Sequence, residues 1–242
     1  MRVAVCLCGH LRSFDRIYDT LKTHILDPYQ ADIFITLWAD SVGTWLPRSS
    51  TPDPLNHPGY ILESPPVSND QLMTVLHTLK PKGVVIDNYY MRDDQFSYIA
   101  KTYSQWHSGH ADLAPKAVLS MAWTRYACVS LKKQYERMHN FKYDRVICTR
   151  FDMAHYSPVD LNSLDPNVLT DVFSGHPDFP GDQWLCGSSE LIDIYGDMFA
   201  NIDPLVQQGT YKQSSHDWLK AWLAYKNAPW QGRSDLNIFV VR

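Results

Sequence analysis

Continuous apolar runs alternate with segments of helical periodicity along the N-terminal part of the chain. Residues 2–8 form an apolar run of strand length, which is typical of a strand buried on both faces beneath helices. A helix is predicted over 14–26 with Ser13 as its N-cap, and Asp32–Trp38 is predicted to be a second buried strand. Strand, turn, helix and strand in this order predict an α/β fold with a right-handed crossover.

The same alternation continues to the C-terminal end. The longest predicted helix covers 116–138 behind Pro115, because apolar side chains recur at helical spacing from Val118 to Val129. The other predicted elements are helices over 70–79 (capped by Ser68 or Asn69), near 188–200 and from Ser214 or Ser215 to 225, and strands at 83–87, 146–148, 168–174, 183–186 and 236–241. We expect a mixed, mainly parallel central sheet with helices on both faces.

Two segments lack a regular period. Residues 40–69 contain six prolines, and a loop of this length inside a compact domain is usually functional or disordered. We interpret it as a lid or acceptor-binding loop, with a simple surface excursion as the alternative. Residues 88–114 are polar and aromatic and are predicted to form irregular helical turns.

Composition and charge narrow the function classes. The 242 residues, 45% of them hydrophobic, can bury a core as one domain or as two lobes that share a core. A net charge of -4 with scattered Lys and Arg offers no basic patch for nucleic acid or a membrane surface. No apolar run approaches the roughly 20 residues that span a bilayer, and the N-terminus has no signal-peptide layout. We therefore expect a soluble, cytoplasmic protein, in which the five cysteines are free buried thiols.

Candidate chemistry lies where predicted strands end, because ligands of open α/β sheets bind outside the carboxyl ends of the strands. Gly9, His10 and Arg12 follow the first strand. The glycine lets backbone approach a ligand closely, and the arginine can pair with a phosphate. A tight turn with a surface arginine is the alternative. Asp87 ends the third strand and can accept hydrogen bonds from a nucleobase or ribose, or serve as a turn or cap residue.

Arg150 and Asp152 end the strand that follows the longest helix. A carboxylate that leaves a buried strand must be solvated, paired or bound to metal. Mg²⁺ and Mn²⁺ prefer one or two carboxylates together with substrate phosphate oxygens, so Asp152 is a candidate metal ligand. An internal ion pair between Arg150 and Asp152 is the alternative.

Two more acidic residues precede later elements. Asp182 could act as a general base or bind a sugar hydroxyl, and Trp184 could stack on a sugar face. Asp217, next to His216, opens the last helix, where a favourable interaction with the helix N-terminus explains it almost as well. The histidines near strand ends, His10, His155 and His176, have no ligand partner at diagnostic spacing and are expected to be structural.

Several function classes lack their motifs. The chain has neither G-x-G-x-x-G nor G-x-x-x-x-G-K-[ST], which argues against a dinucleotide-binding fold and a P-loop nucleotidase. A hydrolase would need a G-x-S-x-G elbow, and the Gly187 segment lacks the second glycine. A methyltransferase usually has a glycine-rich turn after the first strand, where this chain has Gly9 alone.

Several blocks, in this order and spacing, resemble the small soluble GT-A-like glycosyltransferases of large DNA viruses and bacterial polysaccharide clusters. They are residues 6–14, 31–38, 120–121, 131–133, 143–152, 181–184, 187–190 and 216–219. Together they extend over most of the chain except the proline-rich segment and residues 88–114. The resemblance implies a GT-A-like domain with a nucleotide-sugar-binding lobe over about 1–150 and an acceptor-side lobe over about 151–242.

The resemblance also implies an activity, the transfer of a sugar from a nucleotide-diphosphate donor to a hydroxyl of a glycan acceptor. Such enzymes usually hold the donor diphosphate through a divalent metal on a D-x-D step. Here the matching step is Arg150-Phe151-Asp152, which keeps only the second acidic position and leaves Asp152 as the implied ligand of Mn²⁺ or Mg²⁺. The other implied nucleotide-binding residues are Gly9, His10, Arg12, Asp87 and Arg150, and His216 falls where a late metal ligand sometimes lies.

An inverting transferase also needs a carboxylate to deprotonate the acceptor hydroxyl. Asp182 and Asp217 are the two candidates, and the family more often has Glu at the second position. A retaining enzyme would not need this base. The main alternative is a GT-A-like module that binds carbohydrate or a partner without catalysis. The incomplete D-x-D step and an aromatic content of 13% motivate that alternative.

Overall fold

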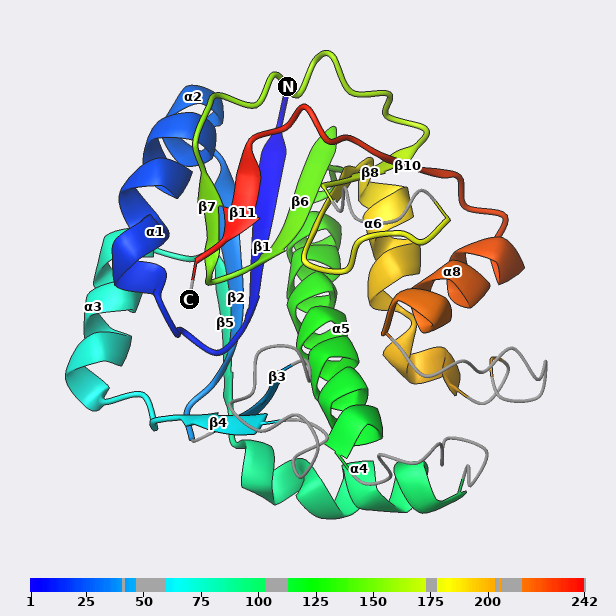
Figure 1. Ribbon diagram of the computed structural model, residues 1–242. Coiled ribbons are helices and arrows are strands. Elements are labelled where there is room, and N and C mark those ends of the chain that lie inside the picture. Colours follow the sequence, from blue (N-terminus) through cyan, green and yellow to red (C-terminus); the bar gives the residue numbers. More distant parts are fainter. Residues whose placement is uncertain are drawn as a thin grey trace.

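The computed structural model describes residues 1–40, 42–46, 60–102, 113–172, 178–202, 205 and 215–241. Within these ranges the chain forms a seven-stranded central sheet, with helices packed on both faces (Figure 1). The strands of this sheet are β1 (Val3–Gly9), β2 (Asp32–Trp38), β5 (Gly83–Asp87), β6 (Arg145–Arg150), β8 (Leu169–Asp171), β9 (Trp184–Gly187) and β10 (Trp230–Gly232). Two small antiparallel pairs are added by β3 (Val42–Leu46) with β4 (Tyr60–Ser64) and β7 (Met153–His155) with β11 (Ile238–Val240).

The helices lie between these strands in sequence. They are α1 (Phe14–Leu21), the π-helical turn η1 (Lys22–Leu26), α2 (Asp27–Tyr29), α3 (Asn69–Leu79), α4 (Tyr89–Thr102), α5 (Leu113–His139), α6 (Ser189–Gly196), the 3-10 turn η4 (Phe199–Asn201) and α8 (Ser215–Tyr225). None of the helices in the described ranges combines the length and apolar content that crossing a membrane requires.

Strand β1 is buried on both faces, as its continuous apolar sequence predicts. Val5 and Leu7 pack in a cluster with the apolar side chains of α1 and α3. Cys6 and Cys8, which point to the opposite face, pack in a second cluster with α5, α6 and α8. Because successive side chains of a strand alternate between faces, one apolar run supplies both halves of the core.

The sheet has the order β10-β8-β9-β6-β1-β2-β5. Strands β5, β2, β1 and β6 are mutually parallel, and β9 runs antiparallel between β6 and β8. The mixed, mainly parallel sheet is therefore confirmed. Parallel pairing places the ends of β1, β2, β5 and β6 at one edge, which we call the carboxyl edge. It lies at the bottom in Figure 1, near the β3–β4 ribbon and α4.

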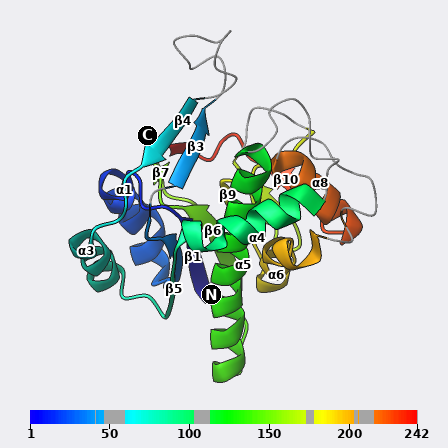
Figure 2. The ribbon, with the colours of Figure 1, turned by 90° about the horizontal axis from the view of Figure 1, so that it is seen from below.

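Side chains beneath the carboxyl edge form a third apolar cluster. It joins the end of β2 to α4, α5 and α8, and its largest members are Trp38, Phe96, Trp218 and Trp222. Viewed from below, α4 lies across this edge and the β3–β4 ribbon projects beside it (Figure 2). This cluster therefore holds α4, α5 and α8 in place around the carboxyl edge, where the residues at the strand ends lie.

Several local predictions are confirmed. The strands predicted at 2–8, 32–38, 83–87 and 146–148 correspond to β1, β2, β5 and β6. Helix α3 has a capping box, because Ser68 and Gln71 exchange side-chain and backbone hydrogen bonds. All five cysteines are free and buried.

Other local predictions are wrong or hold only in part. Ser13 is at the N-cap position of α1, but its side chain makes no capping bond, and its hydroxyl instead donates to the carbonyl of Val241. Residues 88–102 are not irregular, because α4 is a regular helix whose first N–H groups, those of Tyr89 and Tyr90, donate to the carboxylate of Asp40 at 2.8 and 2.9 Å. The closing strand predicted at 236–241 is present as β11, which pairs with β7 outside the central sheet.

Some expectations fall on residues that are not described. The segment 40–69 contains the β3–β4 ribbon, which the sequence did not predict, and the rest of the proposed lid, residues 41 and 47–59, lies outside the described ranges. The same holds for 103–112, for the end of the strand predicted at 168–174, for His176 and for Ser214 as a helix cap.

Candidate functional site

The turn after β1 has a conformation that depends on glycine. Gly9 has a φ of +112°, a backbone region that side-chain-bearing residues rarely adopt. The N–H of Arg12 donates to Nδ1 of His10 at 3.2 Å, so Nε2 carries the imidazole proton and donates to the carbonyl of Pro65 at 3.0 Å. Burial lowers the pKa of His10, which agrees with a neutral ring. The turn thereby holds Arg12 over the carboxyl edge.

Asp152 lies beneath two guanidinium groups. Arg150 binds it through two nitrogens, with Nε donating to Oδ1 at 2.8 Å and Nη2 donating to Oδ2. Arg12 Nη1 donates to the same Oδ2 at 3.1 Å. The side chain of Asp152 is 1% exposed, whereas those of Arg12 and Arg150 are 24% and 19% exposed. The predicted alternative of an internal ion pair between Arg150 and Asp152 is therefore present, and Arg12 extends it.

Asp182 belongs to a second charged group and lies just before β9, the strand next to β6. Ser215 donates to its Oδ2, and Nη2 of Arg125 donates to its backbone carbonyl and lies 4.0 Å from Oδ2. Burial alone raises the pKa of Asp182, but the charges of Arg125 and His216 and the Ser215 hydrogen bond outweigh burial and lower the pKa below its ordinary value. Asp182 is therefore a buried carboxylate that stays ionised.

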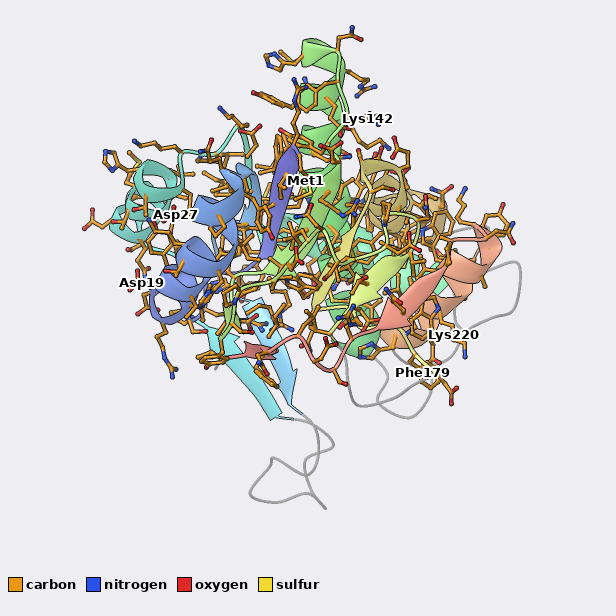
Figure 3. All side chains as sticks on the ribbon, turned by 90° about the horizontal axis from the view of Figure 1, so that it is seen from above. Met1, Asp19, Asp27, Lys142, Phe179 and Lys220 are labelled. Atoms are coloured by element: carbon orange, nitrogen blue, oxygen red, sulfur yellow. The ribbon has the colours of Figure 1, made fainter. Side chains whose placement is uncertain are left out.

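The start of α8 meets this carboxylate. Nδ1 of His216 bonds to the carbonyl of Pro180 at 2.9 Å, and its Nε2 lies 4.0 Å from Oδ1 of Asp182. Asp217 follows in the first helical turn, where negative charge is favourable. The 178–182 segment also contacts α8 further along, because the ammonium of Lys220 lies 4.9 Å from the ring centroid of Phe179; both residues are labelled in Figure 3.

Asp87 is held by different partners. Its Oδ1 accepts from the N–H of Asn88, and its Oδ2 accepts from Arg92 and from Nε1 of Trp123 at 2.9 Å. The guanidinium of Arg92 stacks 3.7 Å from the Trp123 ring centroid. Asp87 ends β5, two strands from β1, and these contacts anchor α4 and α5 at that end of the sheet.

One site residue was missed by sequence reasoning. Arg125 is buried, its Cζ lies 5.2 Å from the ring centroid of Tyr195, and its Nη1 has no hydrogen-bond partner among the described residues. The sequence could have indicated this residue, because Arg125 is a charged residue on the apolar face of the predicted helix, three residues after Ala122 and four before Val129. A charge at such a position needs an internal partner, and here that partner is Asp182.

The groups around Asp152 do not suit the binding of a divalent cation. Both carboxylate oxygens already accept charge-assisted hydrogen bonds, and a cation would lie beside two guanidinium charges. Over the described ranges, no three or more His, Cys, Asp or Glu side chains are grouped so as to hold a metal ion. We therefore assign no chemical step to a metal, and metal dependence stays a prediction.

Comparison with known families and with curated proteins finds no match to this chain. Function is therefore inferred from the carboxyl edge itself. The fold brings together the Gly9–Arg12 turn, Arg150, Asp152, Asp182 and the start of α8, while Asp87 lies apart in its own network.

Trp184 is not available for stacking on a sugar, because it is fully buried. Its Nε1 donates to Nε2 of His155 at 3.1 Å. Burial, with a smaller contribution from the charge of His24, lowers the pKa of His155 to about 4. A protonated His155 could no longer accept the bond from Trp184. His155 is thus a structural histidine, as expected, and it must stay neutral in the folded chain.

We expect stability to fall on mild acidification because of His155. Its pKa is about 4 when folded and about 6.5 when unfolded, so the unfolded chain binds more protons in this window. The contribution of His155 is complete above pH 6.5 and is lost as the pH falls toward 4, with about 2 kcal/mol lost between pH 7 and 5. Urea unfolding of wild type and His155→Gln at both pH values tests this.

The His155→Gln variant keeps an oxygen acceptor for Trp184 and is expected to show a pH dependence smaller by about that amount. The control is His139→Gln, which replaces an exposed histidine and should retain the wild-type pH dependence. An unchanged pH dependence in His155→Gln would show that other groups control the acid sensitivity.

Proposed function

We propose that this protein is a glycosyltransferase with a GT-A-like fold, which moves a sugar from a nucleotide-diphosphate donor to a hydroxyl group of a glycan acceptor. The observation that carries the proposal is the meeting of two partly exposed guanidiniums, Arg12 and Arg150, with the ionised carboxylate of Asp182 at one carboxyl edge. The mixed, mainly parallel sheet is consistent with this fold family.

The guanidinium groups suit the donor half of the reaction. When the bond between the sugar carbon and the diphosphate oxygen breaks, the bond electrons leave with the nucleoside diphosphate. The resulting negative charge needs fixed positive groups in place beforehand. Arg12 lies in the turn after β1 and Arg150 lies at the end of β6, so both are held by the fold before the donor arrives. The Gly9 turn lets the donor approach the backbone there.

The carboxylate suits the acceptor half. In an inverting transfer, the acceptor oxygen bonds to the sugar carbon and gives its proton to a base. Asp182 is ionised at neutral pH because its pKa lies below the ordinary value, and it adjoins the start of α8. Asp217 in the same helical turn is the second candidate base.

Nucleotide binding should raise the temperature of unfolding. We expect one of UDP, GDP or TDP, and not the monophosphate CMP, to stabilise the protein by about 2.7 kcal/mol at about 100 times its dissociation constant, a shift of a few degrees. Thermal unfolding with each nucleotide, with and without Mn²⁺, measures this. The absence of a shift with every nucleotide, in both conditions, would contradict the proposed function.

A second candidate is a binding module for carbohydrate that lacks catalysis. The ion-paired state of Asp152 favours it, because the one acidic residue of the D-x-D-like step is engaged by arginines. This candidate predicts glycan binding that is independent of nucleotides, without consumption of a sugar donor.

A further inference from the structure

Charges of opposite sign alternate around the carboxyl edge. Arg12 and Arg150 enclose Asp152, and Arg125 lies behind Asp182. Arg150 is also close enough to Asp182 to lower its pKa. Among these five groups three guanidiniums face two carboxylates, and Asp217 at the start of α8 adds a third carboxylate nearby. The two groups of the five that are most exposed, Arg12 and Arg150, are both cationic. A region of this kind attracts anions without any added cation.

The exposed fractions of these side chains indicate which of them a ligand from solvent contacts first. Asp152 is 1% exposed, whereas the side chains of Arg12 and Arg150 are 24% and 19% exposed. The carboxylate therefore lies below the guanidiniums, and a molecule arriving from solvent contacts the arginines. A cation approaching Asp152 would have to pass the same two positive charges.

The geometry of Arg150 adds a second argument. Its Nε and Nη2 are both used on Asp152, which fixes the plane of the guanidinium. Within the described part of the chain, its Nη1 makes no hydrogen bond. A guanidinium whose Nε and Nη2 are held by a carboxylate, and whose Nη1 makes no such bond, is preorganised to bind phosphate oxygens with its remaining N–H donors.

We infer that Arg12 and Arg150 hold the diphosphate of the donor directly, without a divalent cation, and that Asp152 is a positioning residue which orients the two guanidiniums. This inference rests on the proposed function, because it takes the nucleoside diphosphate to be the ligand. It assigns to arginine side chains the stabilisation that a metal on a complete D-x-D step would supply.

Isothermal titration with the nucleoside diphosphate selected by the thermal scan tests this inference, once in EDTA and once in Mn²⁺. We expect equal affinity in both buffers. Arg12→Gln and Arg150→Gln should each weaken binding by at least about tenfold, because each removes charge-assisted hydrogen bonds to phosphate. The matching nucleoside, which has no phosphate, should bind all variants alike.

Two further variants complete the test. Arg2→Gln is the control, because Arg2 precedes β1 at the opposite edge and stacks on Phe141. It should leave diphosphate affinity unchanged. Asp152→Asn leaves one acceptor oxygen for the arginines but places an NH2 donor where Arg150 had its second acceptor. Its affinity in EDTA should therefore fall by about threefold, which is less than in either arginine variant. A metal ligand at this position would instead make Asp152→Asn lose the binding.

The outcomes separate this inference from the proposed function. Binding that requires Mn²⁺ and disappears in Asp152→Asn would overturn the arginine assignment and leave the transferase proposal standing. Binding in EDTA that is unaffected in both arginine variants would also overturn it. Failure of every nucleotide to bind, with or without Mn²⁺, would overturn the proposed function and this inference together.

Discussion

Asp182→Asn is expected to lower the rate of sugar transfer by about 10²–10⁴-fold, the usual contribution of a general base. The substitution keeps the shape of the side chain and its hydrogen bond from Ser215, but it removes the negative charge that would take the acceptor proton. Initial rates of nucleoside-diphosphate release, in the presence of acceptor, measure the effect at a temperature where circular dichroism shows both proteins folded.

The pH profile gives this prediction a second readout. Because the pKa of Asp182 lies below its ordinary value, the carboxylate is ionised throughout the neutral and weakly acidic range. The acid limb attributable to Asp182 should therefore lie below the pH at which an ordinary aspartate titrates, near 3.9. Any loss of rate between pH 7 and 5 must come from other groups.

Asp217→Asn is the matched control for the base assignment, since Asp217 lies in the same helical turn as the Ser215 and His216 partners of Asp182. We expect its rate to remain much closer to wild type. The opposite pattern, with activity lost in Asp217→Asn and retained in Asp182→Asn, would move the base to Asp217 and leave Asp182 as a structural partner of Arg125.

Lys132→Met is expected to destabilise the fold by about 3–5 kcal/mol, the usual loss when one partner of a buried ion pair is removed. Lys132 is fully buried in α5, where its ammonium lies 3.1 Å from Oε2 of Glu136 and 2.7 Å from Oδ1 of Asp193. It also bonds to Ser189, which donates to Oε1 of Glu136 at 2.6 Å. Its loss leaves Glu136, itself 1% exposed, with Lys142 as its remaining cation.

The neighbouring residue provides the control for this second prediction. Lys133 pairs with Asp197 across the same two elements, but both side chains are about one-third exposed. Lys133→Met should cost less than about 1 kcal/mol. Adding Glu136→Gln to Lys132→Met should recover part of the stability, because it removes a buried negative charge that only the half-exposed Lys142 would still offset. Urea unfolding of the four proteins measures these differences, and equal losses in the two single variants would contradict the prediction.

The strands of the fold were largely predictable because they are buried on both faces. The apolar runs of β1 and β2 have the length of strands, which favours a strand over a buried helix, and α5 shows its period over many turns. The helix α4 was not predicted because polar and aromatic residues mask its period. Its N-terminus is capped from a distance, by Asp40 at the end of another strand.

The site was predictable only in part, for a similar reason. Strand ends identified Arg12, Arg150 and Asp152, because parallel strands bring their carboxyl ends to one edge. Asp182 reaches the same edge because it precedes β9, which runs antiparallel to β6. The sequence does not show which charges pair, so it could not place Arg12 on Asp152 or Arg125 behind Asp182. Trp184 was misinterpreted because the sequence does not show that it joins the core cluster of Met153 and Ala154 and bonds to His155, all of which belong to β7, a strand outside the central sheet.

The central claim, that this protein uses a nucleotide-sugar donor, is tested most directly by donor turnover. Wild-type protein would be incubated with UDP-, GDP- and TDP-linked sugars in the presence of a panel of glycan acceptors, and the released nucleotide followed by chromatography, with Asp182→Asn as the matched control. We predict release from one nucleotide class by the wild type and a loss of about 10²–10⁴-fold in the variant. A wild-type protein that binds glycans but consumes none of these donors would contradict the transferase and support the binding module.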